Sequence, residues 1–354
     1  MVRNMDKILS IIVPSYNMEG YLPKCLCSLV VAPDLMEKFE VLVVNDGSKD
    51  RTSDIAHKFE AEYPLTFRVV DKNNGNYGSC INAALPLVTG KYVKVLDADD
   101  SFATANFALF IKYLSELHED LDLIVTDYDT IDEDGIVTEQ TRFPYPKEEI
   151  FGIDQLLSVF TGFIFMHAIT YRTKMVLDSG YRQTEGISYT DMEWASLPFA
   201  HVNRVSYFPH VIYKYLFGRV GQTVDRAKYV ANIWMQGKVA LDILESAIYR
   251  SLGGNCSARV YIDRLITYIL KCFYITILRI TNRNVMDKCV QIDKALKEVS
   301  EEFYRDTDEW FISRYVRFHY VRLWRSGYSV NTLKFVLFKA YYHLAKCIGA
   351  LTHK

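Results

Sequence analysis

Three carboxylates, Asp97, Asp99 and Asp100, stand within four positions of the stretch VKVLDADDSF, directly behind a run with the pattern of a buried strand. Carboxylates this close repel one another when ionised, so they need a cation beside them or a fully solvated turn. An oxygen-only cluster suits Mg²⁺ or Mn²⁺, which bind through one or two carboxylates plus substrate phosphates. Taken alone, the pattern leaves a metal and nucleotide site and a solvated acidic turn both open.

Other phosphate-binding motifs are missing from the sequence. It contains no GxxxxGK[ST], the stretch NNGNYGSC lacks the spacing of GxGxxG, and the first apolar run ends in PSYN instead of glycines. These absences argue against a P-loop enzyme and against an ordinary dinucleotide dehydrogenase. A metal ion would then be left to hold the phosphates.

Strands and helices alternate along the first hundred residues and must position these acids. LSIIVPSY, EVLVVNDGS, TFRVV and KYVKVLD are short apolar runs typical of buried parallel strands, and stretches with helical spacing separate them. Such alternation predicts an α/β fold, a mostly parallel sheet with helices on both faces. A further strand is expected at 120–132, then a less regular stretch to about Asp225, then a C-terminal helical segment.

Polar clusters follow three of the four predicted strands. PSYN ends the first strand, NDGS the second and DADD the fourth. Ligands of open α/β sheets bind beyond the carboxyl ends of the strands, so we expect these clusters to share one rim.

Charge is distributed unevenly, although the net charge is only −2. Residues 311–354 carry eight Lys and Arg and no Asp or Glu, which leaves −10 on the rest. Basic and aromatic residues interleave there at helical spacing, as in RYVRFHYVRLWRS. This pattern fits helices on an anionic membrane surface, and it fits equally a helical subdomain packed by its apolar face. Nucleic-acid binding is disfavoured, because the rest is acidic and no recognition motif occurs.

Cysteine usage and hydropathy favour a cytoplasmic protein. A peripheral position on the inner face of the cell membrane stays open. The seven cysteines are scattered, without a CxxC pair, as expected of reduced thiols. The first apolar stretch is broken by Pro14 and reads as a strand, not as a signal peptide. The longest apolar run, at 265–280, is interrupted by Lys271 and Arg279, so no spanning helix is expected.

Three segments together resemble a known family. IIVPSYNMEGYLPKCLCSL, VLVVNDGSKDRTSDIA and NNGNYGSCINAALPLVTGKYVKVLDADD, in this order and spacing, resemble the donor half of the family 2 glycosyltransferases with the GT-A fold. The resemblance is close over 8–102 and fades by about Val224. It implies a Rossmann-like GT-A domain at 1–225, with a nucleotide-sugar donor half at 1–102 and an acceptor half at 103–225. A helical region at 226–354 follows, basic at its end.

The resemblance also implies roles for residues of the donor half. The positions that match nucleotide-sugar contacts are Pro14, Tyr16 and Glu19 for base and ribose, Asp46 for the uracil ring, and Asn74 and Gly75 for a loop beside the donor. Asp97 and Asp99 match the DxD motif, with Asp99 as the direct metal ligand and Asp97 facing the ribose or a metal-bound water. For Asp100 we expect a structural role in capping the next segment. Asn45 departs from the more usual DDGS.

Sugar transfer also needs a base for the acceptor hydroxyl, and the resemblance implies a second carboxylate for it. In GISYTDMEWASLPF, Thr190 and Asp191 replace the usual Glu-Asp pair, so Asp191 is the predicted base, with a helix N-cap as its alternative role and Glu193 as the second candidate. Further on, YKYLFGRVGQTV resembles the segment that closes over the diphosphate. Arg219 could neutralise phosphate charge there.

Three further residues are candidates for the acceptor side: His167, Asp127 and Asp129. A packed histidine and plain loop acids are their alternative readings.

The sequence therefore predicts an inverting, metal-dependent hexosyltransferase using Mn²⁺ or Mg²⁺. It would move a sugar from a UDP-sugar to a hydroxyl of a saccharide or lipid-linked saccharide acceptor, in surface polysaccharide or glycoconjugate assembly. Two alternatives stay open: a polyprenyl-phosphate sugar synthase, and a non-catalytic nucleotide-sugar-binding subunit that serves a partner enzyme. An oligomer is possible, and no nucleic-acid partner is expected.

Overall fold

The computed structural model of the protein describes residues 7–219, 221–223, 225–254, 256–313 and 316–327. They form two compact units. The first comprises residues up to 228 together with 245–266, and the second comprises 229–244 and the part from 267 onward. Residues 245–266 thus group with the first unit, although they follow the boundary predicted at Asp225. Residues 332–351, the last part of the predicted C-terminal helical segment, lie outside the described residues.

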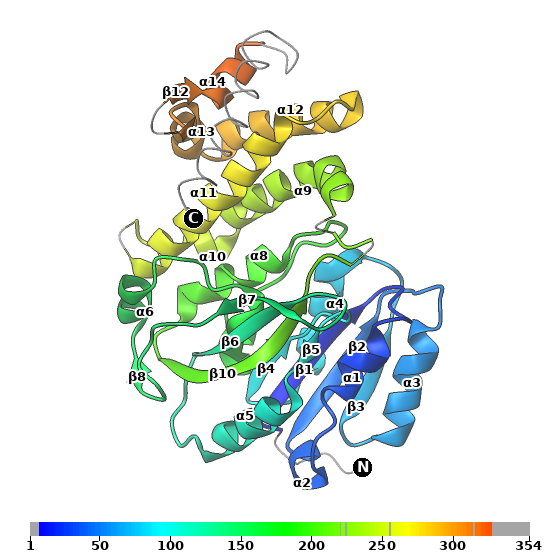
Figure 1. Cartoon of the computed structure of the whole chain (residues 1–354). Helices are drawn as coiled ribbons and strands as arrows, with labels where there is room; N and C mark the ends of the chain where they lie inside the picture. The colour runs from blue at the N-terminus through cyan, green and yellow to red at the C-terminus, as the bar shows by residue number, and fades with distance from the viewer. Residues whose placement is uncertain (1–6, 220, 224, 255, 314–315, 328–354) are drawn as a thin grey trace. The chain divides into compact units, whose positions relative to one another are not determined.

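One ten-stranded sheet organises the first unit, in the order β3-β2-β1-β4-β9-β6-β10-β5, with β7 beside β6 and β8 beside β10. Its strands are β1 (Leu9–Ser15), β2 (Phe39–Asn45), β3 (Phe67–Asp71), β4 (Tyr92–Val95), β5 (Ser101–Phe102), β6 (Leu123–Ile131), β7 (Val137–Thr141), β8 (Ile150–Phe151), β9 (Ile169–Arg172) and β10 (Val205–Leu216). Strands β3, β2, β1 and β4 pair in parallel, and β6 pairs in parallel with β10 (Figure 1). The α/β fold class is confirmed.

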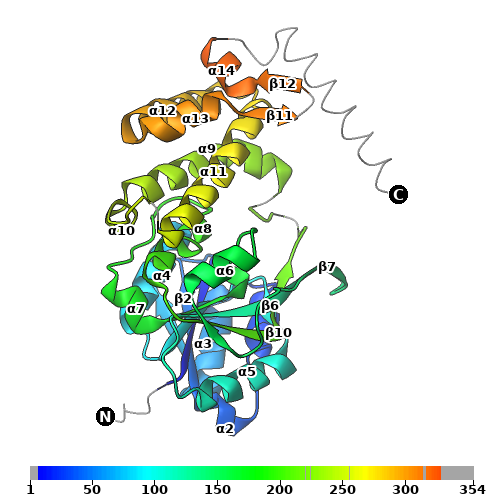
Figure 2. The same cartoon turned by 90° about the vertical axis from the view of Figure 1, so that its left-hand side faces the viewer.

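Helices of the first unit lie on both faces of the sheet, as predicted. They are α1 (Leu22–Cys27), α2 (Pro33–Met36), α3 (Thr52–Glu62), α4 (Asn76–Ala84), α5 (Thr104–Glu116), α6 (Ile153–Val159), α7 (Thr173–Asp178), α8 (Asp191–Trp194) and α10 (Ala247–Arg250), with short 3₁₀ turns at Leu85–Leu87, Met166–Ala168 and Leu197–His201. Helices α2 and α5 cover one face, whereas α4 and α7 lie on the other (Figure 2).

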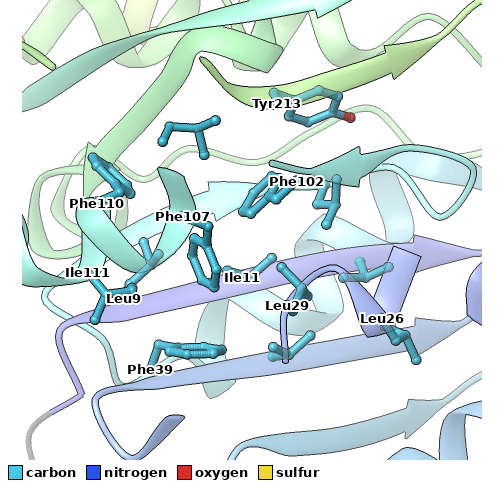
Figure 3. Packing of buried hydrophobic residues seen from close by; sticks show 14 of the residues in the cluster. Leu9, Ile11, Leu26, Leu29, Phe39, Phe102, Phe107, Phe110, Ile111 and Tyr213 are labelled. Atoms are coloured by element: carbon cyan, nitrogen blue, oxygen red, sulfur yellow. The ribbon is translucent and has the colours of Figure 1, made fainter. Parts of the chain in front are cut away.

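A continuous apolar core fixes the donor-side strands. Phe107 and Phe110 of α5 pack against Leu9 and Ile11 of β1 and Phe39 of β2, all fully buried (Figure 3). The rings of Phe39 and Phe107 meet edge to face at 5.1 Å between centroids. Inward-facing residues at alternate positions of β1 supply this core, which leaves the ends of the strands for polar residues.

Helices dominate the second unit. It holds most of α9 (Arg226–Glu245), the end of α11 (Ser257–Ile277), then α12 (Arg283–Val299), α13 (Glu301–Asp308) and α14 (Tyr320–Arg325), with the hairpin β11 (Phe311–Ser313) and β12 (Val316–His319). The helical spacing predicted over RYVRFHYVRLWRS is wrong in its first half, because the β-favouring residues VRFH form strand β12 before α14 begins.

The arginines of α14 are paired with acids inside the second unit. Arg325 Nη2 lies 2.6 Å from Asp293 of α12, its Nη1 lies 2.9 Å from Asp308 of α13, and its guanidinium covers the ring of Tyr304 at 3.5 Å. Arg322 pairs with Glu309. These two arginines of the basic end thus have acidic partners within the second unit, and the membrane reading and the packed-subdomain reading both stay predictions. Among the described residues, none of the helices has the length and apolarity to cross a membrane.

Candidate active site

The three polar strand ends share one rim, as expected. Strands β1 and β2 pair in register so that Ser15 lies opposite Asn45, and the Asp46 amide donates to the Ser15 carbonyl at 2.9 Å. Strand β4 runs parallel on the other side of β1 and delivers Asp97 beyond its end. Parallel pairing thus brings together polar groups that are 30 (Ser15 and Asn45) to 82 (Ser15 and Asp97) residues apart in the sequence.

The carboxylates of Asp97, Asp99 and Asp100 each offer an oxygen within 4.8 Å of the others. Asp100 is buried and uses both oxygens: the Tyr213 hydroxyl donates to one and the Leu216 amide to the other, each at 2.6 Å. Asp100 therefore fastens the end of β10, a structural role as predicted, although through β10 and not as a cap of the next segment. Asp97 and Asp99 remain as the pair facing the rim.

Arg219 lies against this pair. Its Nε is 2.6 Å from Asp99 Oδ2, and the side chains of Arg219 and Asp99 are only 10% and 11% exposed. The guanidinium also covers the ring of Tyr21 at 5.0 Å. A turn closed by Gln222 holds the arginine, since Gln222 accepts from the Gly218 amide at 3.0 Å and donates to the Leu216 carbonyl at 2.7 Å.

Electrostatics in the cluster follow from burial. Burial first, and then the charge of Asp99, raises the pKa of Asp97 above its usual range, while Arg219 acts in the opposite direction. The pKa of Asp100 is likewise raised, by burial and then by Asp99. Burial and mutual repulsion disfavour the ionised form of these acids, so a bound cation would stabilise their carboxylates. The all-oxygen donor set fits a hard divalent ion. Asp97 and Asp99 would hold it.

Asp191, the predicted base, opens helix α8 and lies within the same field of charge. Burial raises the pKa of its carboxyl to about 6, against the lowering effect of the backbone amides of Asp191 and Met192. Its charge contributes to raising the pKa values of Asp97 and of the Tyr77 phenol. A carboxyl with a pKa close to neutral is suited to proton transfer. The alternative of a helix N-cap is not what the structure shows, since Thr190 is the N-cap residue and Asp191 is the first helical one.

Glu193, the second candidate for the base, accepts hydrogen bonds with both of its carboxylate oxygens. It is buried, and it accepts from the Thr184 amide at 2.7 Å and from the Thr184 hydroxyl at 2.6 Å. These bonds shape the loop that precedes Asp191. That loop also contacts the donor side, because the Gly186 amide donates to the Gly75 carbonyl at 2.8 Å.

Asp46 organises the loop that carries Asn74 and Gly75. Its carboxylate accepts from Lys72 Nζ at 2.6 Å, from Asn74 Nδ2 at 3.0 Å, and from the amides of Gly75 and Asn76 at 2.9 Å. A single buried carboxylate thus fixes the loop predicted to run beside the donor. The contact of Asp46 with a uracil ring stays a prediction, and the bonds to the loop are an addition that sequence reasoning missed.

Of the three residues predicted to line the base and ribose, Tyr16 and Glu19 lie on the loop that follows β1, and Pro14 lies within β1. Tyr16 is 42% exposed, whereas Pro14 lies buried inside β1. Glu19 accepts from the Arg51 amide at 3.0 Å, and its own amide donates to Asp50 at 3.0 Å, so it ties this loop to the start of α3. The exposed ring of Tyr16 is the member of this group best placed to meet a base.

Tyr77 is a functional candidate that sequence reasoning missed. Its hydroxyl donates to Asp97 Oδ1 at 2.9 Å, and Tyr77 is the second residue of α4, directly after the loop fixed by Asp46. Tyr77 therefore links the loop that carries Asn74 and Gly75 to Asp97 of the acidic pair. The signal was present, because the tyrosine lies inside the stretch NNGNYGSC, but the pairing with Asp97 comes from the fold.

His167 is held in an aromatic setting. Its ring stacks on Tyr215 at 4.5 Å and meets Tyr213 at 4.8 Å and Tyr128 at 5.0 Å. Burial, and then the charge of Lys94, lowers the pKa of His167 to about 3, which keeps the ring neutral. Lys94 is itself fully buried, donates to the carbonyls of His167 and Ile169 at 2.8 and 3.0 Å, and has a pKa lowered to about 7 by burial.

Asp127 and Asp129 lie on β6 and have partners in the sheet. Asp127 accepts from the Tyr207 hydroxyl at 2.7 Å and from the Phe143 amide at 3.2 Å, while Arg142 lies 2.7 Å from Asp129. Burial raises the pKa of Asp127. These contacts support β7 and β10, and the assignment of the two acids to an acceptor site stays a prediction.

The class to which this fold belongs is that of the GT-A glycosyltransferases. A solved structure of Staphylococcus aureus TarS 1-349 in complex with UDP-GlcNAc superposes with a TM-score of 0.60 at 20% identity, and the match covers 83% of this chain and 82% of that one. A likeness at this identity speaks for the fold alone. The predicted GT-A architecture is thereby confirmed.

Residues 10–175 match the family described as glycosyl transferase family 2, and the family resemblance is confirmed. The poly(ribitol-phosphate) beta-N-acetylglucosaminyltransferase TarS of S. aureus strain Mu50 is 28% identical over 219 residues, which is 62% of this chain and 37% of TarS. An uncharacterized glycosyltransferase of Mycoplasma pneumoniae, the MG025 homolog, is 38% identical over 102 residues, 28% of this chain and 34% of that protein. The chain thus spans between a third and two fifths of the length of these relatives.

Proposed function

We propose that the protein transfers a hexose from a UDP-sugar to a hydroxyl group of a saccharide acceptor, with inversion at the sugar carbon, in the assembly of a surface polysaccharide or glycoconjugate. The observation that carries the proposal is the convergence of a desolvated carboxyl, Asp191, with the acidic pair Asp97 and Asp99 at one rim. The TarS relative, named for transfer of N-acetylglucosamine and solved with UDP-GlcNAc, supports a UDP-sugar as donor.

The acidic pair would hold the donor. Asp97 and Asp99 would bind Mn²⁺ or Mg²⁺, which when present neutralises the charge of the diphosphate as it departs. Arg219 lies beside the same acids and would pair with the phosphate oxygens, because guanidinium groups bind phosphate in a bidentate manner. Tyr16 would cover the base, and the loop fixed by Asp46 would run along the donor. These assignments follow the family resemblance at matching positions.

Asp191 would carry out the proton transfer. Its carboxylate takes the proton of the acceptor hydroxyl as the oxygen attacks the anomeric carbon, and the bond from that carbon to the diphosphate oxygen breaks with its electron pair going to UDP. One displacement by one base inverts the configuration. The raised pKa of about 6 fits this role, because such a carboxylate is basic enough to accept a proton and still mostly ionised at neutral pH.

The test separates a catalyst from a nucleotide-binding subunit without turnover. Calorimetric binding of UDP with MnCl₂ is measured for the wild type, Asp191→Asn and Asp99→Asn, and UDP release from UDP-sugars is measured in parallel. We expect Asp191→Asn to bind UDP like the wild type and to lose turnover, whereas Asp99→Asn loses metal-dependent binding. Turnover that persists in Asp191→Asn would contradict the assignment of the base.

A location at the inner face of the cell membrane belongs to the proposal as well, since nucleotide sugars and reduced thiols are cytoplasmic. Support for direct membrane contact is weaker than the sequence suggested, because two of the basic residues, Arg322 and Arg325, have acidic partners.

A further inference from the structure

An aromatic row runs along the end of β10. Tyr213, Tyr215 and Phe217 stand at alternate positions, and alternate residues of a strand point to the same face. The pairing of β10 with β6 continues one residue past the end of β10, since the Phe217 amide donates to the Ile131 carbonyl of β6 at 2.9 Å. The Tyr213 hydroxyl reaches Asp100 at 2.6 Å, so this face of the strand is the one turned toward the acidic cluster.

The row becomes more exposed along its length. Tyr213 is fully buried (Figure 3), Tyr215 is partly buried, and Phe217 is 52% exposed. Tyr215 stacks on His167 with 4.5 Å between ring centroids and 30° between planes, and its ring lies 6.0 Å from that of Phe217. The neutral His167 thus packs behind Tyr215. The aromatic row runs from a fully buried ring, Tyr213, to an exposed one, Phe217.

Tyr215 lies within electrostatic range of the acidic cluster at 97–100 and of Asp191. Besides burial, the charges of Asp100, Asp97, Asp191 and Asp99 raise the pKa of its phenol. An aromatic surface at this place lies within electrostatic range of both the predicted base, Asp191, and the acidic pair Asp97 and Asp99. It is therefore positioned for the molecule that must present a hydroxyl to Asp191.

We propose that Tyr215 and Phe217, backed by His167, form the platform on which a pyranose ring of the acceptor packs. This inference rests on the proposed function and narrows its acceptor class. The apolar C–H face of a pyranose suits an aromatic surface, while its hydroxyls can bond to the nearby carboxylates.

Charge favours an uncharged sugar ring over a phosphate-linked polyol. The charges that act on Tyr215 are carboxylates. The nearby cation Arg219, which pairs with Asp99, would be occupied by the donor diphosphate under the proposed function and so would not be free for a phosphate of the acceptor. A polymer such as poly(ribitol-phosphate), which the name of TarS specifies for that protein, brings a negative charge with every unit and would be repelled here.

Saturation-transfer NMR tests the platform directly. The probes are the methyl β-glycosides of glucose, galactose, mannose, N-acetylglucosamine and N-acetylgalactosamine, and ribitol 5-phosphate, each added to protein with UDP and MgCl₂. The variants are Phe217→Ala, which removes an exposed ring, and Phe311→Ala, a matched control at a 44% exposed phenylalanine of the second unit. Calorimetric affinity for UDP is measured for each protein.

We expect at least one pyranoside to show saturation transfer with the wild type and with Phe311→Ala, and its affinity to fall about tenfold in Phe217→Ala, as for an aromatic contact residue. No pyranoside binding to the wild type, equal binding to Phe217→Ala, or binding of ribitol 5-phosphate alone would overturn the platform. A loss of UDP affinity in Phe217→Ala would also overturn it, because the row would then belong to the donor. Pyranoside binding needs no turnover, so it remains readable if the proposed transfer reaction fails.

Discussion

Removing Arg219 should destabilise the metal-free protein and make its stability depend on added metal. In Arg219→Gln, the carboxyl group of Asp99, which is 11% exposed and stands beside Asp97, loses the cation at 2.6 Å. Breaking one side of a buried pair costs about 3–5 kcal/mol, whereas losing a surface pair costs about 0–1 kcal/mol. The matched control is Arg182→Gln, because Arg182 and its partner Glu185 are 73% and 43% exposed at 2.7 Å.

Urea unfolding in EDTA, followed by circular dichroism, measures the difference. At a slope of about 2–3 kcal/mol per M, the midpoint of Arg219→Gln should fall by roughly 1–2 M. Arg182→Gln should stay within about 0.5 M of the wild type. Adding MnCl₂ should raise the midpoint of Arg219→Gln more than that of the wild type, since an ion can replace the lost guanidinium. Equal midpoints for the two variants in EDTA, or no response of Arg219→Gln to Mn²⁺, would refute the reasoning.

Further predictions concern the base and the donor loop. Burial raises the carboxyl pKa of the proposed base, Asp191, to about 6, so kcat/KM should fall about tenfold per pH unit below pH 6. Asp191→Asn should lose about 10²–10⁴-fold in kcat together with this acidic limb, and a pH profile unchanged in the variant would exclude Asp191 as the base. Tyr77→Phe removes the hydrogen bond to Asp97 and should lower unfolding free energy by about 1–3 kcal/mol in urea titration, and an unchanged value would mean that the bond contributes nothing. Gly78→Ala would place a Cβ 2.0 Å from a backbone oxygen of the loop before Asp191, so it should cost about 1–3 kcal/mol and reduce turnover, whereas Gly20→Ala, with nothing within 4 Å, should do neither.

The donor half could be predicted from the sequence because its signals are local. Each strand from β1 to β4 is an apolar run that ends in polar residues, and parallel pairing must place those ends on one rim. The parallel sheet and the helices on both of its faces followed from the same alternation, whereas the order of the strands came from the structure. Asp97, Asp99 and Asp191 could be singled out because the motifs around them lie in register with the family.

The contacts between distant segments could not be predicted. Asp100 is held by Tyr213 and Leu216, more than 110 residues away, and no periodicity in the sequence pairs them. The role of Asp46 as the anchor of the donor loop depends on backbone amides, which carry no sequence signal. Helical spacing misled the reading of β12, because alternating and helical patterns overlap in a run of only four residues.

The measurement that tests the central claim most directly is UDP release from a panel of UDP-sugars, with Mn²⁺ or Mg²⁺ and with EDTA, for the wild type, Asp99→Ala and Asp191→Asn. The account predicts that the wild type releases UDP from one UDP-sugar only when metal is present, and that both variants lose this activity. No release from any UDP-sugar by the wild type, or metal-independent release that persists in Asp99→Ala, would contradict it.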